Sequence, residues 1–341
     1  MAWTLNNRLF FAAIFLSGFS ALIYQLIWVR LLGLVFGVSS FAVATVVAVF
    51  LLGLGLGSYF FGNWSERARD PLKIYMYVEL GIAALSLVSY LLISELPLYP
   101  SLYQLAYNRL DFYGLSLVRL LLSIMVLLPP VFMIGGTLPL VSKYFLTAPS
   151  ELGSKFSKFY YMNKLGAFAG ALLTGFVLVR FFGVFVTLMI AVAGNLTVAA
   201  LIASSRSEQA PRPDQPTAQK SPHSYMLPVL LLTGFISLGY EMLWARILST
   251  FGLSTSQAFS IIVAGFLLGF SVGSFLVSRR IDDRSNLEAL FGRVCILTAL
   301  SGALVLFGFR RFEALTAAME ESLPVGMLTT SLAVAFVVSF I

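Results

Sequence analysis

Long apolar segments separated by short polar stretches recur along the whole chain of 341 residues. Segments of about 20 apolar residues can cross a hydrocarbon core roughly 30 Å thick as helices. Because they recur throughout, a cleaved signal peptide does not explain them. The pattern therefore predicts an all-α integral membrane protein with about ten transmembrane helices. The predicted spans are residues 9–34, 39–62, 73–94, 115–137, 159–180, 182–203, 226–248, 255–278, 287–309 and 325–341.

One polar stretch is longer than the others and divides the chain. Residues 204–224 read SSRSEQAPRPDQPTAQKSPHS, which is rich in proline and has no apolar periodicity. Such a composition predicts a flexible linker. We therefore expect a first transmembrane repeat at 1–203 with about six helices, and a second at 225–341 with about four.

Composition and charge favour lipid as the main solvent. The chain is 59% hydrophobic and 11% charged, with a mean hydropathy of +0.92, whereas soluble domains have roughly a quarter of their residues charged. The formal net charge of +7 does not indicate nucleic acid, because the basic residues lie in short loops between apolar segments. Placing the N-terminus in the cytoplasm puts 15 of the 22 basic residues on the inner side, as membrane proteins prefer. We expect a multi-pass protein of the cytoplasmic membrane with cytoplasmic N-terminus and linker.

The two halves share an internal repeat at an offset of 216 positions (234 minus 18). GFSALIYQLIWVRLL from Gly18 matches GFISLGYEMLWARIL from Gly234, and AVFLLGLGLGS from Ala48 matches AGFLLGFSVGS from Ala264. Over residues 18–58 the alignment has 17 identities in 41 positions, which indicates duplication. An even number of spans in the first half predicts parallel repeats, as in major-facilitator-type proteins.

The second repeat has counterparts for only the first four helices of the first. The sequence ends at Ile341 within an apolar run, where a charged carboxylate in hydrocarbon is costly. From the sequence we expect either a truncated product or a chain whose partner lies elsewhere.

Glycines spaced by four residues mark one face of two predicted helices. Gly53 and Gly57 lie in the second span, and Gly265, Gly269 and Gly273 lie in the eighth. Small residues at this spacing let helix backbones approach closely in lipid. The primary prediction is helix packing, with a sliding or gating surface as the alternative.

Two acidic residues, Glu79 and Glu241, lie well inside predicted spans. A carboxylate in the bilayer costs a few kcal/mol, so its presence requires a function or a partner. For Glu241 we weigh a proton- or cation-handling role against pairing with a neighbouring helix. For Glu79 a structural hydrogen bond is the stronger alternative to function.

A repeated string, Tyr-(Gln/Glu)-x-x-Trp-x-Arg, is the most specific local feature. Its members include Tyr24, Gln25 and Trp28 in the first half, and Tyr240, Glu241 and Trp244 in the second. One interpretation is an aromatic belt at the membrane boundary, with each arginine reaching the headgroups. The other is a pair of polar sites lining a central cavity, where the tryptophans hold an organic cation by cation–π attraction.

Motifs of soluble enzymes and cofactor sites are absent from the sequence. The single histidine, His223, lies in the linker, and the single cysteine, Cys295, lies in an apolar segment, so no metal-ligand cluster is expected. Lys164 follows Asn163 at the start of the fifth span, and we expect it to extend towards the membrane boundary. The sequence therefore predicts no cofactor and no catalytic residue.

Four strings carry a resemblance to a known family. GFSALIYQLIWVRLLGLVFG, AVFLLGLGLGS, GGTLPL from Gly135 and YYMNKLGAFAGALLTGF from Tyr160 resemble the membrane region of bacterial spermidine-synthase-like membrane proteins. In that family a multi-helix region commonly precedes an aminopropyltransferase domain. The resemblance covers roughly residues 10–200, and 226–280 through the repeat. It implies a bacterial inner-membrane location, a polyamine-like cation and a soluble synthase partner.

The soluble domain of that family has a glycine-rich nucleoside site and catalytic aspartates, and this sequence has no counterpart to either. Enzyme activity therefore stays open. Three hypotheses follow: a membrane module that anchors a synthase or passes polyamine-like cations to it; an independent transporter of a small organic cation; and a packing subunit of a larger membrane complex.

Overall fold

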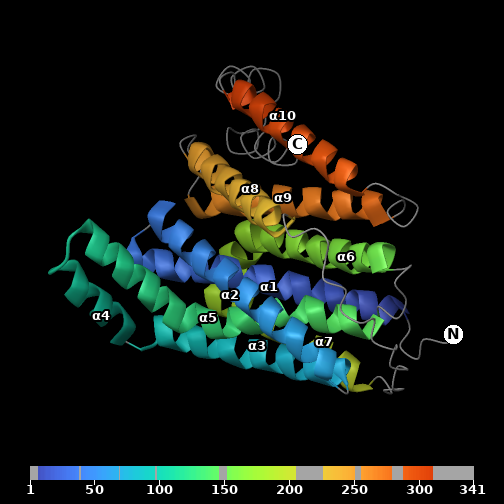
Figure 1. The fold of residues 1–341 in the computed structure, drawn as a ribbon. Helices are drawn as coiled ribbons and strands as arrows, with labels where there is room; N and C mark the ends of the chain where they lie inside the picture. The colour runs from blue at the N-terminus through green and yellow to red at the C-terminus, as the bar shows by residue number, and fades with distance from the viewer. Residues whose placement is uncertain are drawn as a thin grey trace.

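The computed structural model describes residues 7–37, 40–68, 70–96, 98–145, 152–204, 226–249, 255–278 and 287–309. Within these ranges every regular element is a helix (Figure 1). The first part holds α1 (Asn7–Phe36), α2 (Ser40–Arg67), α3 (Pro71–Ser94), α4 (Leu98–Tyr107) and α5 (Phe112–Phe145). Next come α6 (Leu152–Leu173), the π-helical turn η2 (Thr174–Leu178), α7 (Val179–Ser204), α8 (Met226–Ser249), α9 (Thr255–Ser278) and α10 (Leu287–Phe309).

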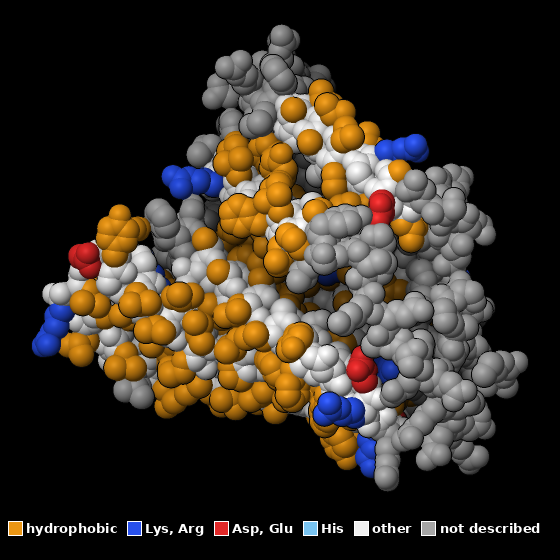
Figure 2. All heavy atoms as spheres, in the orientation of Figure 1, with side chains coloured by type: hydrophobic (Ala, Val, Ile, Leu, Met, Phe, Trp, Pro, Cys, Tyr) orange, Lys and Arg blue, Asp and Glu red, His pale blue; other side chains and the backbone are white. Residues whose placement is uncertain are grey.

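Eight helical segments are long and apolar enough to cross a membrane. Large apolar side chains cover much of the visible surface (Figure 2), as expected where lipid is the solvent. The prediction of an all-helical, multi-pass membrane chain is therefore confirmed at this level. The predicted count of ten spans stays a prediction, because span 325–341, and the linker beyond Ser204, lie outside the described residues.

One of the eight segments runs from Phe156 to Ser204 and has 49 residues. A straight helix of that length would measure about 74 Å at 1.5 Å per residue, more than twice the hydrocarbon core. The chain instead breaks at Gly183, whose φ of 75° lies in the left-handed region that favours glycine. Since α6 and α7 both pack on α1, we infer that the segment folds back at this glycine, two residues beyond the predicted boundary.

The short helix α4 was not anticipated from the sequence, which predicted only a connection between residues 94 and 115. Its ten residues span about 15 Å, too short to cross the bilayer. Tyr103 packs against the ring of Phe36 at the end of α1, with centroids 5.0 Å apart. Its hydroxyl accepts hydrogen bonds from Arg119 Nε at 3.1 Å and Nη2 at 2.9 Å. These contacts fix α4 over one end of the bundle.

Glycines explain how closely the first-half helices pack. A Cβ at Gly57 would overlap the carbonyl oxygen of Phe132, and one at Gly53 would lie 2.8 Å from Val131 Cγ1. Both glycines therefore serve the contact of α2 with α5, the most extensive helix pair described, as the packing interpretation predicts. A Cβ at Gly273 would meet open space, so this member of the α9 series has no such role within the described structure.

Helix α1 lies at the centre of the first half and contacts α2, α3, α6 and α7. Helix α6 packs on α1 on one side and on α9 on the other, and so joins the two halves (Figure 1). Helix α8 packs on α9, while α10 lies at the edge of the bundle. Helix α6 therefore lies between α1 of the first half and α9 of the second.

Candidate functional site

A cavity of about 330 Å³ lies between the two halves. Its wall is formed by α1, α2, α5, α6, α8 and α9, and is mostly apolar. The volume is within the range of small-ligand pockets, roughly 300–1,000 Å³. The polar side chains in the wall are those of Ser17, Gln25, Ser58, Thr137, Asn163, Lys164, Ser237 and Glu241.

The walls contributed by the two halves correspond through the internal repeat. Every lining residue of α8 and α9 is the counterpart, 216 positions on (241 minus 25), of a lining residue in α1 or α2. The pairs are Ala21 and Ser237, Leu22 and Leu238, Gln25 and Glu241, Val47 and Val263, Phe50 and Phe266, Leu51 and Leu267, and Leu54 and Phe270. Equivalent faces of equivalent helices therefore enclose the cavity.

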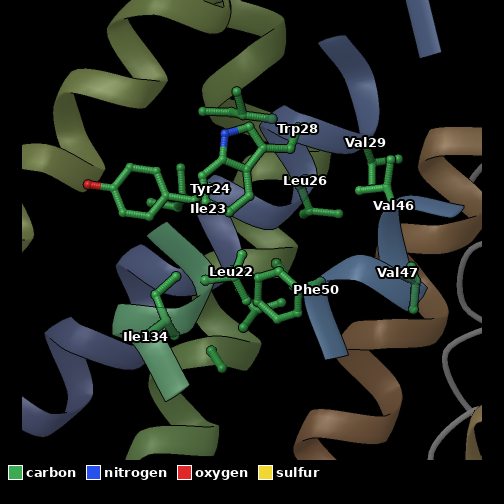
Figure 3. Close-up of a cluster of buried hydrophobic side chains, with 14 of the residues drawn as sticks. Leu22, Ile23, Tyr24, Leu26, Trp28, Val29, Val46, Val47, Phe50 and Ile134 are labelled. Carbon is green, nitrogen blue, oxygen red and sulfur yellow. The ribbon is translucent and has the colours of Figure 1, made fainter. Parts of the chain in front are cut away.

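The first-half side of this wall is visible in Figure 3, where Leu22, Phe50 and Ile134 gather from α1, α2 and α5. The ring of Phe50 from α2 lies beside Leu22 of α1 (Figure 3), and Val47, about one turn earlier on α2, also lines the cavity. The ring of Tyr24 points away from this group (Figure 3). Leu22 and the ring of Tyr24 therefore lie on different faces of α1.

Two residues of opposite charge line the cavity. They are Lys164 of α6 and Glu241 of α8. The Lys164 ammonium also lies 5.1 Å from the centre of the Tyr160 ring, a cation–π distance. The sequence predicted that Lys164 extends to the membrane boundary, and the structure instead places it in the cavity wall. The second-half helices thus bring a carboxylate to a site whose first-half counterpart, Gln25, is neutral.

The aromatic pairs do not line the cavity. Tyr24 and Trp28 are fully buried in the first half and stack with centroids 5.7 Å apart. Their counterparts Tyr240 and Trp244 stack at 5.9 Å with nearly parallel rings. Of the seven predicted site residues, only Gln25 and Glu241 share the cavity. The rings that line this cavity are those of Phe50, Phe266 and Phe270, and the cation–π site on the tryptophans stays a prediction.

Glu79, the seventh predicted site residue, is fully buried between α1, α3 and α7. Its carboxylate accepts a hydrogen bond from Ser17 Oγ at 2.6 Å and another from Asn195 Nδ2. The Asn195 Oδ1 atom in turn accepts a hydrogen bond from the Tyr24 hydroxyl at 2.9 Å. Ser17 also lines the cavity, so Glu79 is separated from it by one hydroxyl group.

Sequence reasoning missed Ser17 and Asn195. Asn195 carried a signal, because it is an amide within the otherwise apolar stretch AVAGNLTVAA, and such groups bond across helices in lipid. Ser17 carried none, since serine is common in membrane helices. In the described part of the chain, no group of three or more His, Cys, Asp or Glu residues could hold a metal ion.

No family model, curated protein or solved structure matches this chain.

Proposed function

We propose that the chain is a membrane carrier with two parallel, major-facilitator-like repeats, which binds one small organic solute in the central cavity. The observation that carries this proposal is the cavity wall, in which every residue from α8 and α9 is the repeat counterpart of a residue from α1 or α2. Transporters built from repeats bind substrate near the bilayer midplane at the interface between the repeats. A pure anchor or packing subunit has no need of a charged cavity there.

The charges favour a solute that carries both an ammonium group and an acidic group. Glu241 suits an ammonium group, as expected for an organic cation, while Lys164 suits a carboxylate or phosphate. A polyamine would place several positive charges in a cavity that already contains a lysine, and like charges at close range repel. An amino-acid-like solute satisfies both residues, with Gln25 available for a further hydrogen bond.

The test measures thermal unfolding of the purified full chain in detergent with three probes: γ-aminobutyrate, spermidine and succinate. A ligand at 100 times its Kd stabilises the folded state by about 2.7 kcal/mol. We expect γ-aminobutyrate to raise the unfolding temperature and to be exchanged across reconstituted liposomes. Glu241→Gln and Lys164→Gln should each abolish both effects, whereas Lys158→Gln, an exposed lysine on the same helix, should not. Equal responses of all four proteins would refute the cavity as the binding site.

A second candidate function follows from the resemblance. All four strings that resemble the spermidine-synthase-like membrane proteins contain cavity-lining residues: Gln25, Phe50, Thr137 and Lys164 lie in one string each. This favours a cavity shared with that family, from which polyamine-like cations would pass to an aminopropyltransferase partner. Stabilisation by spermidine rather than γ-aminobutyrate, with co-purification of such an enzyme in mild detergent, would favour this function over the first.

A further inference from the structure

The buried carboxyl group of Glu79 lies outside the cavity wall and plays no part in the solute site proposed above. The exposed fraction of Glu79 is 0%, and that of Asn195 is 1%. Ser86, about two turns further along α3, is also 0% exposed. Because the carboxyl group is enclosed by α1, α3 and α7, bulk water has no direct path to it in this conformation.

The groups that face Glu79 are neutral. Ser17 from α1 and Asn195 from α7 donate to its two oxygens. The titratable groups that face it are Tyr75, from its own helix, and Tyr24, from α1. No lysine or arginine among the described residues, including those of α5, compensates its charge. An unpaired carboxylate inside a membrane protein is costly and marks a functional site by default.

The hydrogen bonds suit both protonation states. When Glu79 is ionised, Ser17 Oγ donates to its Oε1 atom, 2.6 Å away. When Glu79 is protonated, its own O–H donates to Ser17 Oγ, because a hydroxyl both donates and accepts. The orientation of Asn195 is fixed by the Tyr24 hydroxyl that donates to its Oδ1 atom, so its Nδ2 donor stays directed at Glu79. The Ser17 hydroxyl rotates so that its oxygen accepts the hydrogen bond of the protonated carboxyl group.

Ser17 is also the link to the cavity, since it belongs to the cavity wall. We propose that Glu79 is a proton-binding site that exchanges with the central cavity through the Ser17 hydroxyl. In the protonation step, a hydronium ion in the cavity gives a proton to Ser17 Oγ, and Ser17 passes its own proton to Glu79 Oε1. The products are water, an unchanged serine and a neutral carboxylic acid. The proposal builds on the cavity described above, but its test requires no solute.

The experiment is pH-difference infrared spectroscopy of the full chain in liposomes. Wild type should gain a carboxylic-acid C=O band on acidification that Glu79→Gln lacks. If Glu79→Gln does not fold, Glu79→Asp assigns the same band by shifting its frequency. A Glu79 band that is identical at all pH values would overturn the proposal, because the group would then be permanently in one state.

Exchange kinetics test the route. After a switch to D₂O, Ser17→Ala should slow deuteration of the Glu79 carboxylic acid by about 100-fold, the lower range of what a positioned proton-transfer group contributes. The matched control is Ser237→Ala, which removes another cavity serine at a position where the first repeat already has Ala21. Its exchange rate should equal that of wild type. Equal rates in Ser17→Ala and wild type would refute Ser17 as the route.

Discussion

The side chain of Asn195 on α7 joins α7 to α1 and α3 by hydrogen bonds. Its removal should lower the free energy of unfolding, and the structure assigns this loss to two separate hydrogen bonds. Asn195→Ala deletes the donor to Glu79 on α3 and the acceptor of the Tyr24 hydroxyl on α1. It also leaves the Tyr24 hydroxyl, in a fully buried residue, without this partner. In membrane proteins a hydrogen bond between helices contributes about 0.6 kcal/mol on average and up to about 1.7 kcal/mol. Two lost bonds therefore predict a loss of about 1–3 kcal/mol in the free energy of unfolding.

The assay is equilibrium unfolding of the full chain in mixed micelles with increasing sodium dodecyl sulfate. Tyr24→Phe should cost about 1 kcal/mol in wild type, the typical value of one net hydrogen bond. In the Asn195→Ala background it should cost almost nothing, because its partner is gone. The matched control is Thr197→Ala on the same helix. This variant loses only the hydrogen bond from the Thr197 hydroxyl to the Ala193 carbonyl oxygen within α7. Additive effects of Tyr24→Phe and Asn195→Ala would refute the network, since residues sharing a bond must couple.

Three further predictions concern packing, α4 and topology. Gly166→Ala should destabilise the chain by about 1–3 kcal/mol, because the added Cβ would overpack α6 against the Phe15 backbone. Gly62→Ala should be neutral or stabilising, since a Cβ there has no neighbouring atom within 4 Å. Equal unfolding free energies of the two variants would contradict this prediction. Tyr99→Phe should stabilise the chain by about 1 kcal/mol, because the buried Tyr99 hydroxyl has no hydrogen-bond partner among the residues that the structure describes. Burial raises the pKa of Tyr99, so wild type should lose stability as the pH rises above about 10, where the unfolded chain deprotonates first, and the variant should lose less. A phosphatase reporter inserted within residues 204–224 should be inactive, as expected for a cytoplasmic linker, and an active reporter would reverse the proposed orientation.

The medium, the helical class and most helix positions could be predicted from the sequence, because they depend on local properties. A run of about 20 apolar residues forms a helix in lipid whatever surrounds it, since its backbone has no other hydrogen-bond partners. The predicted span 255–278 coincides with α9, and 73–94 differs from α3 by two residues. The repeat was also readable locally, and so was the pairing of Gln25 with Glu241. The short helix α4 was missed because no apolar segment of membrane length marks it.

Only the tertiary structure decided which faces of these helices meet. In a membrane helix the face towards lipid is as apolar as the face towards protein, so hydrophobic periodicity does not identify the buried side. The sequence therefore could not tell that Tyr24 and Trp28 turn into the first half while Gln25 faces the cavity. Likewise, the hydrogen bond of Glu79 to Ser17 joins residues 62 apart, and that to Asn195 joins residues 116 apart. Such partners are fixed by close helix packing, which no local pattern encodes.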